Sequence, residues 1–357
     1  MMKKSWILTV FTMVSILILA ACGGGDKEGA TSSNGTKGKQ KLVVTSFGGD
    51  YEAAQMEVLV KPFEEEFNAE VEMITLYSAD ALARIKAQKD NPEIDVVQFS
   101  GGQEAQAIKE GLVEEIDSSI LKNISGIYES AILDPKYGPA SAFDALGILY
   151  NKEIVKEVPT SWNDLWKEEY KGDVGIIDIS NTFGLQFLAM NALLNNGDEK
   201  NIDPGFESIK SLLPHASSIV ATTPDLGNLF AQEEVIIAPY DSGYAFNFSK
   251  QGQPIGFSIP EEGGMAIFIN MQVVKGSKNS ELANEFINYS LRPEVQKAFA
   301  EKTGFSPTNK DVEISEELAE VIPHGEEVMN SLIKLDWNTV NEYKGEWTER
   351  WAKLISQ

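Results

Sequence analysis

Cysteine is nearly absent from this chain of 357 residues, in which Cys22 is the only one. A single thiol forms no internal disulfide and supplies no cysteine cluster for a metal. Histidine is almost as rare, and His215 and His324 lie in no nucleophile or metal motif. There is no phosphate loop and no H-E-x-x-H; G-x-S-x-G is also missing, since Ser242 has Tyr240 two residues before it. We therefore expect no enzyme, no cofactor and no metal site.

Basic residues are also scarce. The chain has 30 Lys and Arg against 54 Asp and Glu, which gives a formal net charge of −24. Because binding to duplex nucleic acid needs a basic face that displaces counterions from phosphate, nucleic acid is excluded as a partner. The acidity fits a cationic ligand, but the ordinary solubility of a surface protein explains the same charge.

The first 21 residues have the pattern of an export signal. Lys3 and Lys4 precede an apolar run over residues 6–21, which is shorter than the roughly 20 apolar residues that a membrane-spanning helix needs. The run ends in Leu19-Ala20-Ala21-Cys22, which resembles the bacterial lipobox, where the cysteine is acylated and becomes the new N-terminus. The alternative is a chance cysteine behind an ordinary cleaved signal.

Residues 23–40 contain no large apolar side chain, so we expect the segment from Cys22 to residue 40 to be a flexible tether. As a coil it reaches about 23 Å. A lipid on Cys22 and a short tether would hold the folded part at the extracellular face of the membrane, as suits a Gram-positive cell.

The stretch over residues 146–178 holds two short apolar runs, at 146–150 and 174–177, which predict strands. Between them Pro159 interrupts the chain, and Ser161 and Asp164 have the spacing of a capping box, which predicts a helix from Trp162. Spacing alone allows two interpretations. The stretch is a hinge between two lobes, or it is an ordinary strand, helix, strand unit inside one domain.

Five motifs in order resemble one family. The pattern TSW-DLW-EYKG directly follows a strand ending in YNK, and four later motifs accompany it: Glu262-Gly263-Gly264, Lys275-Gly276-Ser277-Lys278-Asn279, Leu291-Arg292-Pro293-Glu294-Val295 and Gly304-Phe305-Ser306-Pro307-Thr308-Asn309. Together they resemble the extracellular solute-binding proteins of ABC importers, in particular the spermidine and putrescine binders. The resemblance spans residues 42–309 and favours the hinge.

The alternation of strands and helices predicts an α/β protein with mostly parallel sheets flanked by helices. The resemblance implies the two-lobe fold of periplasmic binding proteins, type II, with the ligand cleft between the lobes. We expect a first lobe of residues 41–147 and 272–308, and a second lobe of residues 148–271 and 309–357. The lobes would rotate about strands near Ile148 and Gln272, and the C-terminal helix with Trp347 and Trp351 would pack on the second lobe.

Ligands of such sheets lie beyond the carboxyl ends of the strands. The residues expected to contact the ligand, from strand ends and from the resemblance, are Ser46, Phe47, Gly48, Tyr51, Ser100, Gly101, Asp144, Asp178, Asn181, Thr182, Tyr240, Asp241 and Asn270.

The resemblance implies aromatic rings around a methylene chain and carboxylates at the ammonium ends. Phe47 and Tyr240 fall on two of the aromatic positions. The chain departs from the pattern where a Trp and an Asp are replaced by Ile267 and Ile269, and where a glutamate expected after Asp178 is replaced by the group Ser180-Asn181-Thr182. Losing one partner of a buried charge pair costs about 2–5 kcal/mol.

Asp144 and Asp241 are the acids that could compensate, although a turn or cap role explains each equally well. We expect a small polar ligand that bears an amine, polyamine-like or zwitterionic, with Ser180 to Thr182 taking an anionic end.

The predicted function is that of a substrate-binding lipoprotein that closes on its ligand and delivers it to ABC permease subunits with a separate ATPase. The chain would act as a monomer. Alternatives are ferric-ion binding on the same fold through Tyr240 and Tyr244, a hydrolase, which the missing motifs disfavour, and a surface adhesion protein, which would not close on a solute.

Overall fold

The computed structural model describes residues 39–319 and 321–356. The expected signal sequence, Cys22 and nearly all of the tether lie outside the described residues. In the described part, no helix is both long and apolar enough to cross a membrane.

The strands are β1 (Gln40–Ser46), β2 (Ala69–Thr75), β3 (Val96–Phe99), β4 (Ala140–Asn151), β5 (Val174–Ile177), β6 (Ala216–Val220), β7 (Ile237–Asp241), β8 (Ile255–Ser258), β9 (Met265–Val273) and β10 (Ser306–Pro307). The α-helices are α1 (Gly49–Gln55), α2 (Lys61–Phe67), α3 (Ser78–Ala87), α4 (Gln103–Lys109), α5 (Thr182–Leu194), α6 (Asp203–Leu212), α7 (Thr223–Ala231), α8 (Ser242–Lys250), α9 (Ser280–Ser290), α10 (Pro293–Thr303), α11 (Glu316–Ala319), α12 (Gly325–Ser331) and α13 (Trp337–Ile355). One π-helical turn (Met56–Val60) and five 3₁₀ turns complete the list: Lys122–Gly126, Glu129–Ala131, Trp162–Trp166, Glu168–Tyr170 and Leu213–His215.

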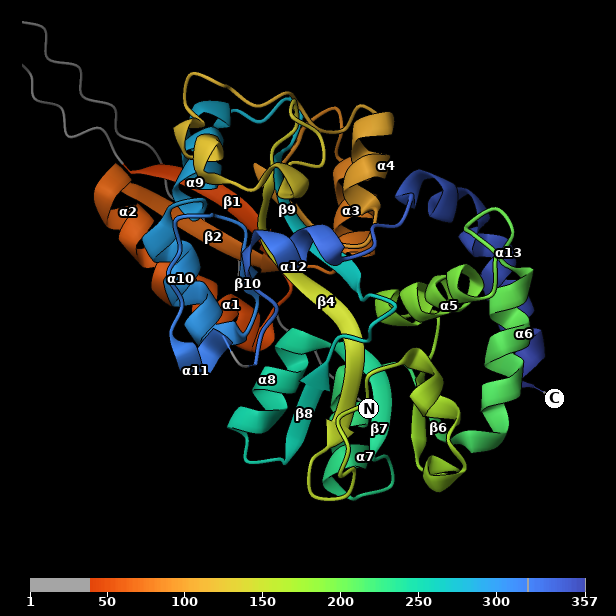
Figure 1. Ribbon diagram of the computed structural model, residues 1–357. Helices are drawn as coiled ribbons and strands as arrows, with labels where there is room; N and C mark the ends of the chain where they lie inside the picture. Colours follow the sequence, from red (N-terminus) through yellow and green to blue (C-terminus); the bar gives the residue numbers. More distant parts are fainter. Residues whose placement is uncertain (1–38, 320, 357) are drawn as a thin grey trace, which may run out of the picture. The chain divides into compact units, whose positions relative to one another are not determined.

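The strands follow the order β2-β1-β3-β9-β4-β7-β5-β6, with β8 and β10 attached to β4. The outer strands pair in parallel, β1 with β2 and β3, and β5 with β6 and β7. The central strands are antiparallel, because β9 pairs with β3 and β4, and β4 pairs with β7. Figure 1 shows β4 running between these two sets of strands with β9 beside it. The prediction of mostly parallel sheets holds for the outer strands, while the strands that connect them are antiparallel.

Two large hydrophobic cores lie at the two ends of this strand order. The first core contains Leu42, Phe63 and Phe286, and packs α2, α9 and the π-helical turn Met56–Val60 on β1, β3 and β9. The second core contains Trp162 and Phe187, and packs α5 and α6 on β4, β5 and β7. Smaller clusters cover the opposite faces, with α3 and α4 on β3 and with α7 and α8 on β7. Each set of strands is therefore covered by helices on both faces, as an α/β protein requires.

The C-terminal helix belongs to the second core, since Val340, Trp347 and Trp351 of α13 are buried in it. In this core the helix packs with residues of α5 and α6. Its first turn also touches α4, where Asn341 Nδ2 donates a hydrogen bond of 2.8 Å to the Gly102 carbonyl. The contact matters because α4 packs with the other set of strands.

Several local predictions need correction. Gln40, expected in the tether, is the first residue of β1, where its backbone pairs with Ala69. Ser161 forms the predicted capping box with Asp164, but the helix behind it is a short 3₁₀ turn, Trp162–Trp166. A π-helical turn, Met56–Val60, joins α1 to α2 and ends two residues before Pro62. Helix α8 was not predicted at all.

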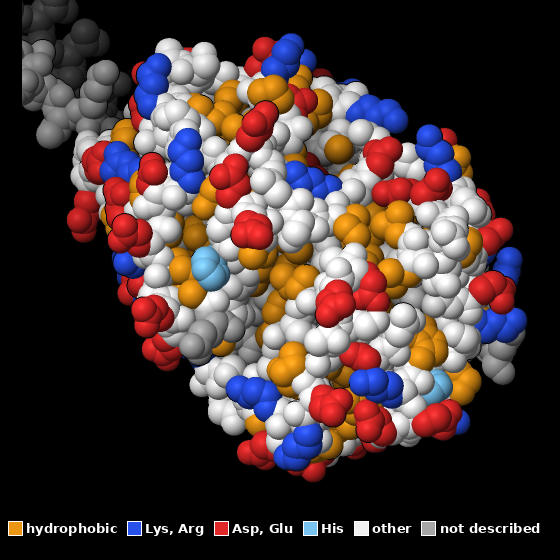
Figure 2. All heavy atoms as spheres, in the orientation of Figure 1, with side chains coloured by type: hydrophobic (Ala, Val, Ile, Leu, Met, Phe, Trp, Pro, Cys, Tyr) orange, Lys and Arg blue, Asp and Glu red, His pale blue; other side chains and the backbone are white. Residues whose placement is uncertain are grey.

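The face drawn in Figure 2 has Lys and Arg side chains scattered among Asp and Glu, and hydrophobic side chains gather toward its middle. No continuous basic patch appears on this face, which agrees with the low content of basic residues.

Candidate functional site

The loop after β1 turns sharply on two glycines. Gly48 has φ 78° and Gly49 has φ 57°, a backbone conformation that favours glycine. At Gly48 a Cβ atom would lie 2.6 Å from Thr75 Cγ2, so no larger residue fits there without movement. The turn lets α1 begin at once and brings the Phe47 ring 5.1 Å from the Tyr51 ring.

Phe47 and Tyr51 belong to an aromatic group that Phe299 and Phe305 complete. The Tyr51 ring lies 5.2 Å from Phe299 and 5.6 Å from Phe305, edge to face in both cases. The Tyr51 hydroxyl donates a 2.8 Å hydrogen bond to Gln98 Oε1, and burial raises the pKa of Tyr51. Tyr51 thus packs and hydrogen-bonds within one set of strands, and we call these four rings the first aromatic group.

A second aromatic group lies around β7 and comprises Phe183, Tyr240, Tyr244 and Phe248. Tyr240 is buried, with its ring 4.8 Å from Phe183 and 5.7 Å from Tyr244. Its hydroxyl shares a short hydrogen bond with Thr223. Burial raises the pKa of Tyr240, and burial together with the charge of Asp241 raises the pKa of Tyr244 to about 12. Both phenols therefore stay protonated at neutral pH.

The two acids that the sequence singled out lie together. Asp144 on β4 and Asp241 at the end of β7 are 1% and 0% exposed, and their carboxyl groups are hydrogen-bonded to each other. The strand register explains the contact, because Asp241 is paired with Leu146, two residues from Asp144 on the same face of β4. A buried contact between two carboxyl groups requires a shared proton.

The surrounding hydrogen bonds show which acid carries that proton. Asp144 accepts hydrogen bonds from the backbone N–H groups of Ala145 (2.7 Å) and Gly243 (3.1 Å), and from the Ser242 hydroxyl. Asp241 Oδ1 accepts from the Tyr244 N–H at 2.9 Å and caps α8, so Asp241 has fewer donors around it than Asp144. Burial, and then the charge of Asp144, raise the pKa of Asp241 well above its ordinary value. Asp241 is the protonated member.

Gly243 brings this acid pair close to the first aromatic group. A Cβ atom at Gly243 would lie 2.7 Å from Asp144 Oδ2 and 3.4 Å from Phe305 Cε2. The first turn of α8 therefore fits between a carboxyl from β4 and a ring from the loop after α10. Rings and carboxyl groups from elements far apart in the sequence meet at this point.

Three of the other predicted residues cluster before α5. Asp178 accepts hydrogen bonds from Trp351 Nε1 (2.8 Å) and from the Ser180 N–H (2.8 Å). Asn181 is the N-cap of α5, accepting from the Phe183 N–H at 2.9 Å. Thr182 meets Gly101 of the loop after β3, where a Cβ atom would lie 2.8 Å from Thr182 Cγ2. The structure thus brings Thr182 and Gly101 together and gives the Asp178 carboxylate protein partners.

The remaining predicted residues are Ser46, Ser100 and Asn270. Ser46 ends β1 and its hydroxyl donates to Gln55 Oε1 at 3.2 Å, and Ser100 follows β3 with its N–H donating to Ser78 Oγ at 3.0 Å. Asn270 on β9 is 2% exposed, and its Nδ2 has no hydrogen-bond partner among the described atoms. Ile269, on the same strand, packs with Ala142 beside the first aromatic group.

Sequence reasoning missed Phe305, Gly243, Ser242 and Thr223. Phe305 lies in the Gly304-to-Asn309 motif that contributes to the family resemblance, and its place in this motif could have marked it as a candidate site residue. The other three contribute through close backbone approach or a single hydroxyl contact. Such contacts leave no pattern in a sequence.

Comparison with known proteins decides the family. A family model described as bacterial extracellular solute-binding protein matches residues 58–322. The chain belongs to this family. The spermidine/putrescine-binding periplasmic protein of Escherichia coli strain K12 is 30% identical over 261 residues, which cover 70% of this chain and 74% of the relative. The gamma-aminobutyric acid-binding protein of Pseudomonas aeruginosa is 26% identical over 285 residues, covering 76% and 78%.

A solved structure supports the same placement of this solute-binding protein. The crystal structure of an ABC transporter protein from Clostridium perfringens superposes with a TM-score of 0.75 at 30% identity, over 88% of this chain and 99% of that one. The family resemblance and the periplasmic-binding-protein-like fold predicted from sequence are confirmed. The chain is a solute-binding protein of an ABC transporter, and its relatives are transport proteins rather than enzymes.

A metal alternative finds little support in the geometry. Among residues 39–319 and 321–356, no three His, Cys, Asp or Glu side chains are grouped so that they could hold a metal ion. The Tyr240 hydroxyl is hydrogen-bonded to Thr223, and the raised pKa values of Tyr240 and Tyr244 disfavour the phenolate form that binds ferric iron.

Proposed function

We propose that this solute-binding protein captures a small solute with a primary ammonium group, and that Asp144 and Asp241 hold that ammonium. The observation that carries the proposal is the buried pair of acids itself, since neither Asp144 nor Asp241 takes part in any ion pair found in residues 39–319 and 321–356. Buried acids are usually paired with a cation or kept neutral, so an acid pair without a protein cation in a candidate site is suited to a cationic ligand. An ammonium group has three donors and a charge that would replace the shared proton.

The two aromatic groups are the natural walls for the rest of the ligand. Phe47 and Tyr240, which match aromatic positions of the polyamine binders, belong to the first and the second group. Ile267 and Ile269 are uncharged, although the family pattern has an acid in this part of the strand. The Asp178 carboxylate already accepts a hydrogen bond from Trp351 Nε1. One acid pair therefore serves one ammonium end, which favours a monoamine or a zwitterion over spermidine.

The other end of the ligand would lie toward the loops before α5 and after β3. Asn181, Thr182 and Ser100 offer hydroxyl and amide groups there. These are neutral donors suited to a carboxylate or another polar end. A relative named for gamma-aminobutyric acid shows that the family includes a binder of an amine with a carboxylate.

Binding would proceed by closure of two lobes, with the boundaries expected from sequence: residues 41–147 and 272–308, and residues 148–271 and 309–357. Strands β4 and β9 pair with each other and run between the two sets of strands, so they are the hinge candidates. The acid pair spans β4 and β7, and Phe305 and Thr182 come from opposite sides of the hinge. Ligand contacts with both sides would stabilise the closed form, and only that difference in affinity can shift the equilibrium.

The cellular role follows from the family and the first residues. Residues 1–21 would direct export, Cys22 would carry a lipid, and the tether would hold the monomeric protein at the outer face of a Gram-positive type membrane. The closed form would be offered to ABC permease subunits, whose energy comes from a separate ATPase. The chain itself would catalyse no reaction.

Thermal unfolding of the purified chain against a ligand panel tests the proposal. The panel contains 4-aminobutyrate and other amino acids, putrescine, spermidine, an aminophosphonate and ferric citrate. A ligand present at about 100 times its dissociation constant adds about 2.7 kcal/mol to the free energy of unfolding, so its midpoint rises visibly. We expect a shift with zwitterions or monoamines that is lost in Asp241→Asn and kept in Asp90→Asn, an exposed acid.

Tight binding of spermidine with no response to amino acids would contradict the single-ammonium site. A shift with ferric citrate alone would favour the metal alternative. No shift with any amine would remove the support for an amine ligand.

A further inference from the structure

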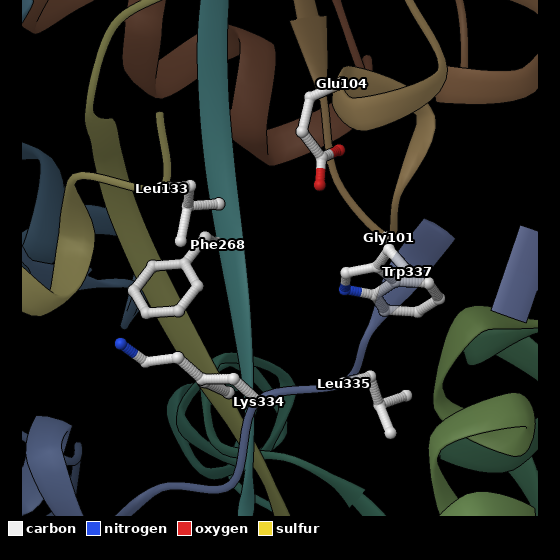
Figure 3. A pocket seen from close by; sticks show the side chains of 8 residues that line it. Gly101, Glu104, Leu133, Phe268, Lys334, Leu335 and Trp337 are labelled. Carbon is white, nitrogen blue, oxygen red and sulfur yellow. The ribbon is translucent and has the colours of Figure 1, made fainter. Parts of the chain in front are cut away.

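A second buried acid, Glu104, lines a small cavity at the contact between α4 and α13. The cavity holds about 40 Å³, enough for one or two water molecules. Its lining consists of Gly101, Glu104, Leu133, Ala266, Phe268, Lys334, Leu335 and Trp337. Figure 3 shows the Glu104 carboxylate pointing into this space from above, with Phe268 on one side and Trp337 on the other.

The cavity is separate from the proposed ammonium site. Side chains alternate along β9, so Ala266 and Phe268, which line the cavity, point away from the face of Ile267. Ile267 is paired with Asp144, and paired residues share a face of the sheet. The strand pair β4 and β9 therefore lies between Glu104 and the Asp144 carboxyl. Glu104 therefore has no direct contact with the ammonium site, and any effect it has on binding acts through the strands between them.

Glu104 is buried without a neutralising cation. It is 6% exposed, and its carboxylate accepts a hydrogen bond of 3.1 Å from the Gly102 N–H. None of the ion pairs found in residues 39–319 and 321–356 involves it. An unpaired charge in such surroundings is costly, and burial raises the pKa of Glu104 to about 7.

The charged groups on the packed elements do not supply a partner. Lys334, before α13, donates a 2.7 Å hydrogen bond to the Ser130 carbonyl and lies over the Phe268 ring. In Figure 3 its ammonium group points away from Glu104. Lys344, on α13, donates to Asn341 Oδ1 at 3.1 Å. Burial lowers the pKa of both lysines.

The elements around Glu104 come from both sides of the hinge. Helix α4 packs with α3 and β3, whereas α13 packs in the second core. Their contact consists of the Asn341 hydrogen bond to Gly102 and of the close approach of Trp337. A Cβ atom added at Gly102 would lie 2.8 Å from Trp337 Cβ. If the lobes separate, this contact breaks and water reaches Glu104.

We infer that Glu104 is a positioning residue for closure: its carboxyl is neutral when α4 meets α13, and its ionisation favours the open form and weakens ligand binding. The inference rests on the proposed function, because it assumes two lobes that close. The sign follows from linkage. The closed form keeps a proton that the open form releases, so the closed-to-open ratio falls as pH rises from the pKa of Glu104 in the open form to its pKa in the closed form, and is constant above the latter.

Pulsed electron-spin measurements of the distance between α4 and α13 test this inference. Cys22, the only native cysteine, is replaced in Cys22→Ser, and labels are placed by Lys109→Cys and Glu349→Cys, both exposed. Distances are recorded from pH 5.5 to 8.5 without ligand, with 4-aminobutyrate and with putrescine. We expect the closed-to-open ratio to fall by up to about tenfold per pH unit from pH 5.5 to about 7, the pKa of Glu104 in the closed form, and to level off above it.

In Glu104→Gln, which keeps the hydrogen-bond acceptor without the charge, the ratio should stay constant over this range. Glu104→Met provides the same test if the amide variant folds poorly, and Glu110→Gln, at the exposed end of α4, should titrate like the parent chain. Identical pH profiles for the parent and Glu104→Gln would overturn the inference, since Lys334 and Lys344 remain in both. A Glu104-dependent profile in a chain that binds no amine supports closure control and contradicts only the proposed ligand.

Discussion

The Trp351 indole donates a hydrogen bond of 2.8 Å from Nε1 to Asp178 Oδ2, joining the last helix to the loop that precedes α5. Trp351 is 3% exposed and belongs to the second core, so this donor is held in place by packing. Because Asp178 also accepts from the Ser180 N–H, its carboxylate is occupied by protein groups on both oxygens. In this conformation the Asp178 carboxylate connects α13 to the loop before α5.

Trp351→Phe should lower the free energy of unfolding by about 1–3 kcal/mol, because Asp178 loses a donor while remaining partly buried. Trp166→Phe is the matched control. Its indole donates to Ser211 at the surface, where water replaces the lost partner. Urea unfolding of both variants measures the loss in the free energy of unfolding. Equal losses in the two variants would show that the hydrogen bond to Asp178 stabilises the fold no more than the surface hydrogen bond of Trp166 does.

Asp241→Asn should weaken binding of the amine ligand by about 30-fold to several thousand-fold, since one partner of a buried charge pair costs about 2–5 kcal/mol. The unliganded fold should tolerate the change, because an amide resembles the protonated carboxyl that Asp241 presents to Asp144. Titration calorimetry measures affinity, with Asp90→Asn as the control. Unchanged affinity in Asp241→Asn would place the ammonium elsewhere.

Ligand binding should release about one proton, because the raised pKa values of Asp144 and Asp241 reflect a shared proton that the ammonium replaces. The sign is that affinity rises with pH until the pair has lost its proton, by at most tenfold per unit. The Glu104→Gln background isolates the pair. Calorimetry in phosphate and in Tris at the same pH gives the number of protons, and a value of zero would contradict the exchange.

In the absence of ligand, the Asp144 and Asp241 pair should make the folded protein less stable as pH rises. A carboxyl whose pKa is raised in the folded protein stabilises the fold at low pH, and this stabilisation is lost as pH rises through the folded pKa. The unfolding midpoint of the free chain should therefore fall over the pH range in which ligand affinity increases. Asp241→Asn should flatten that fall.

Gly243→Ala and Gly345→Ala should change the stability of the protein in opposite directions. At Gly243 the new methyl would lie 2.7 Å from Asp144 Oδ2, so we expect a lower unfolding midpoint and at least a tenfold loss of ligand affinity. Gly345 is exposed within α13, with no atom within 4 Å of a Cβ, and its replacement should stabilise by about 0.5–1 kcal/mol. Stabilisation by Gly243→Ala would show that α8 shifts freely.

Periodicity predicted the strands at 146–150 and 174–177, which lie in the last part of β4 and make up β5. Helix α8 was missed because its residues, Ser242 to Lys250, alternate polar and aromatic side chains and follow a strand without an evident break. Its start is set by the Asp241 cap, whose partner is a backbone N–H three residues on.

The sequence by itself determined the family and the candidate acids Asp144, Asp178 and Asp241, because ordered motifs and local spacing are properties of the chain. Only the tertiary structure decided that Asp144 meets Asp241, that Trp351 occupies Asp178 and that Glu104 is buried at the α4 and α13 contact. Each of these pairs joins residues about a hundred or more positions apart. Their contacts depend on strand register and helix packing, which fix where a carboxyl loses water and therefore whether it carries a proton.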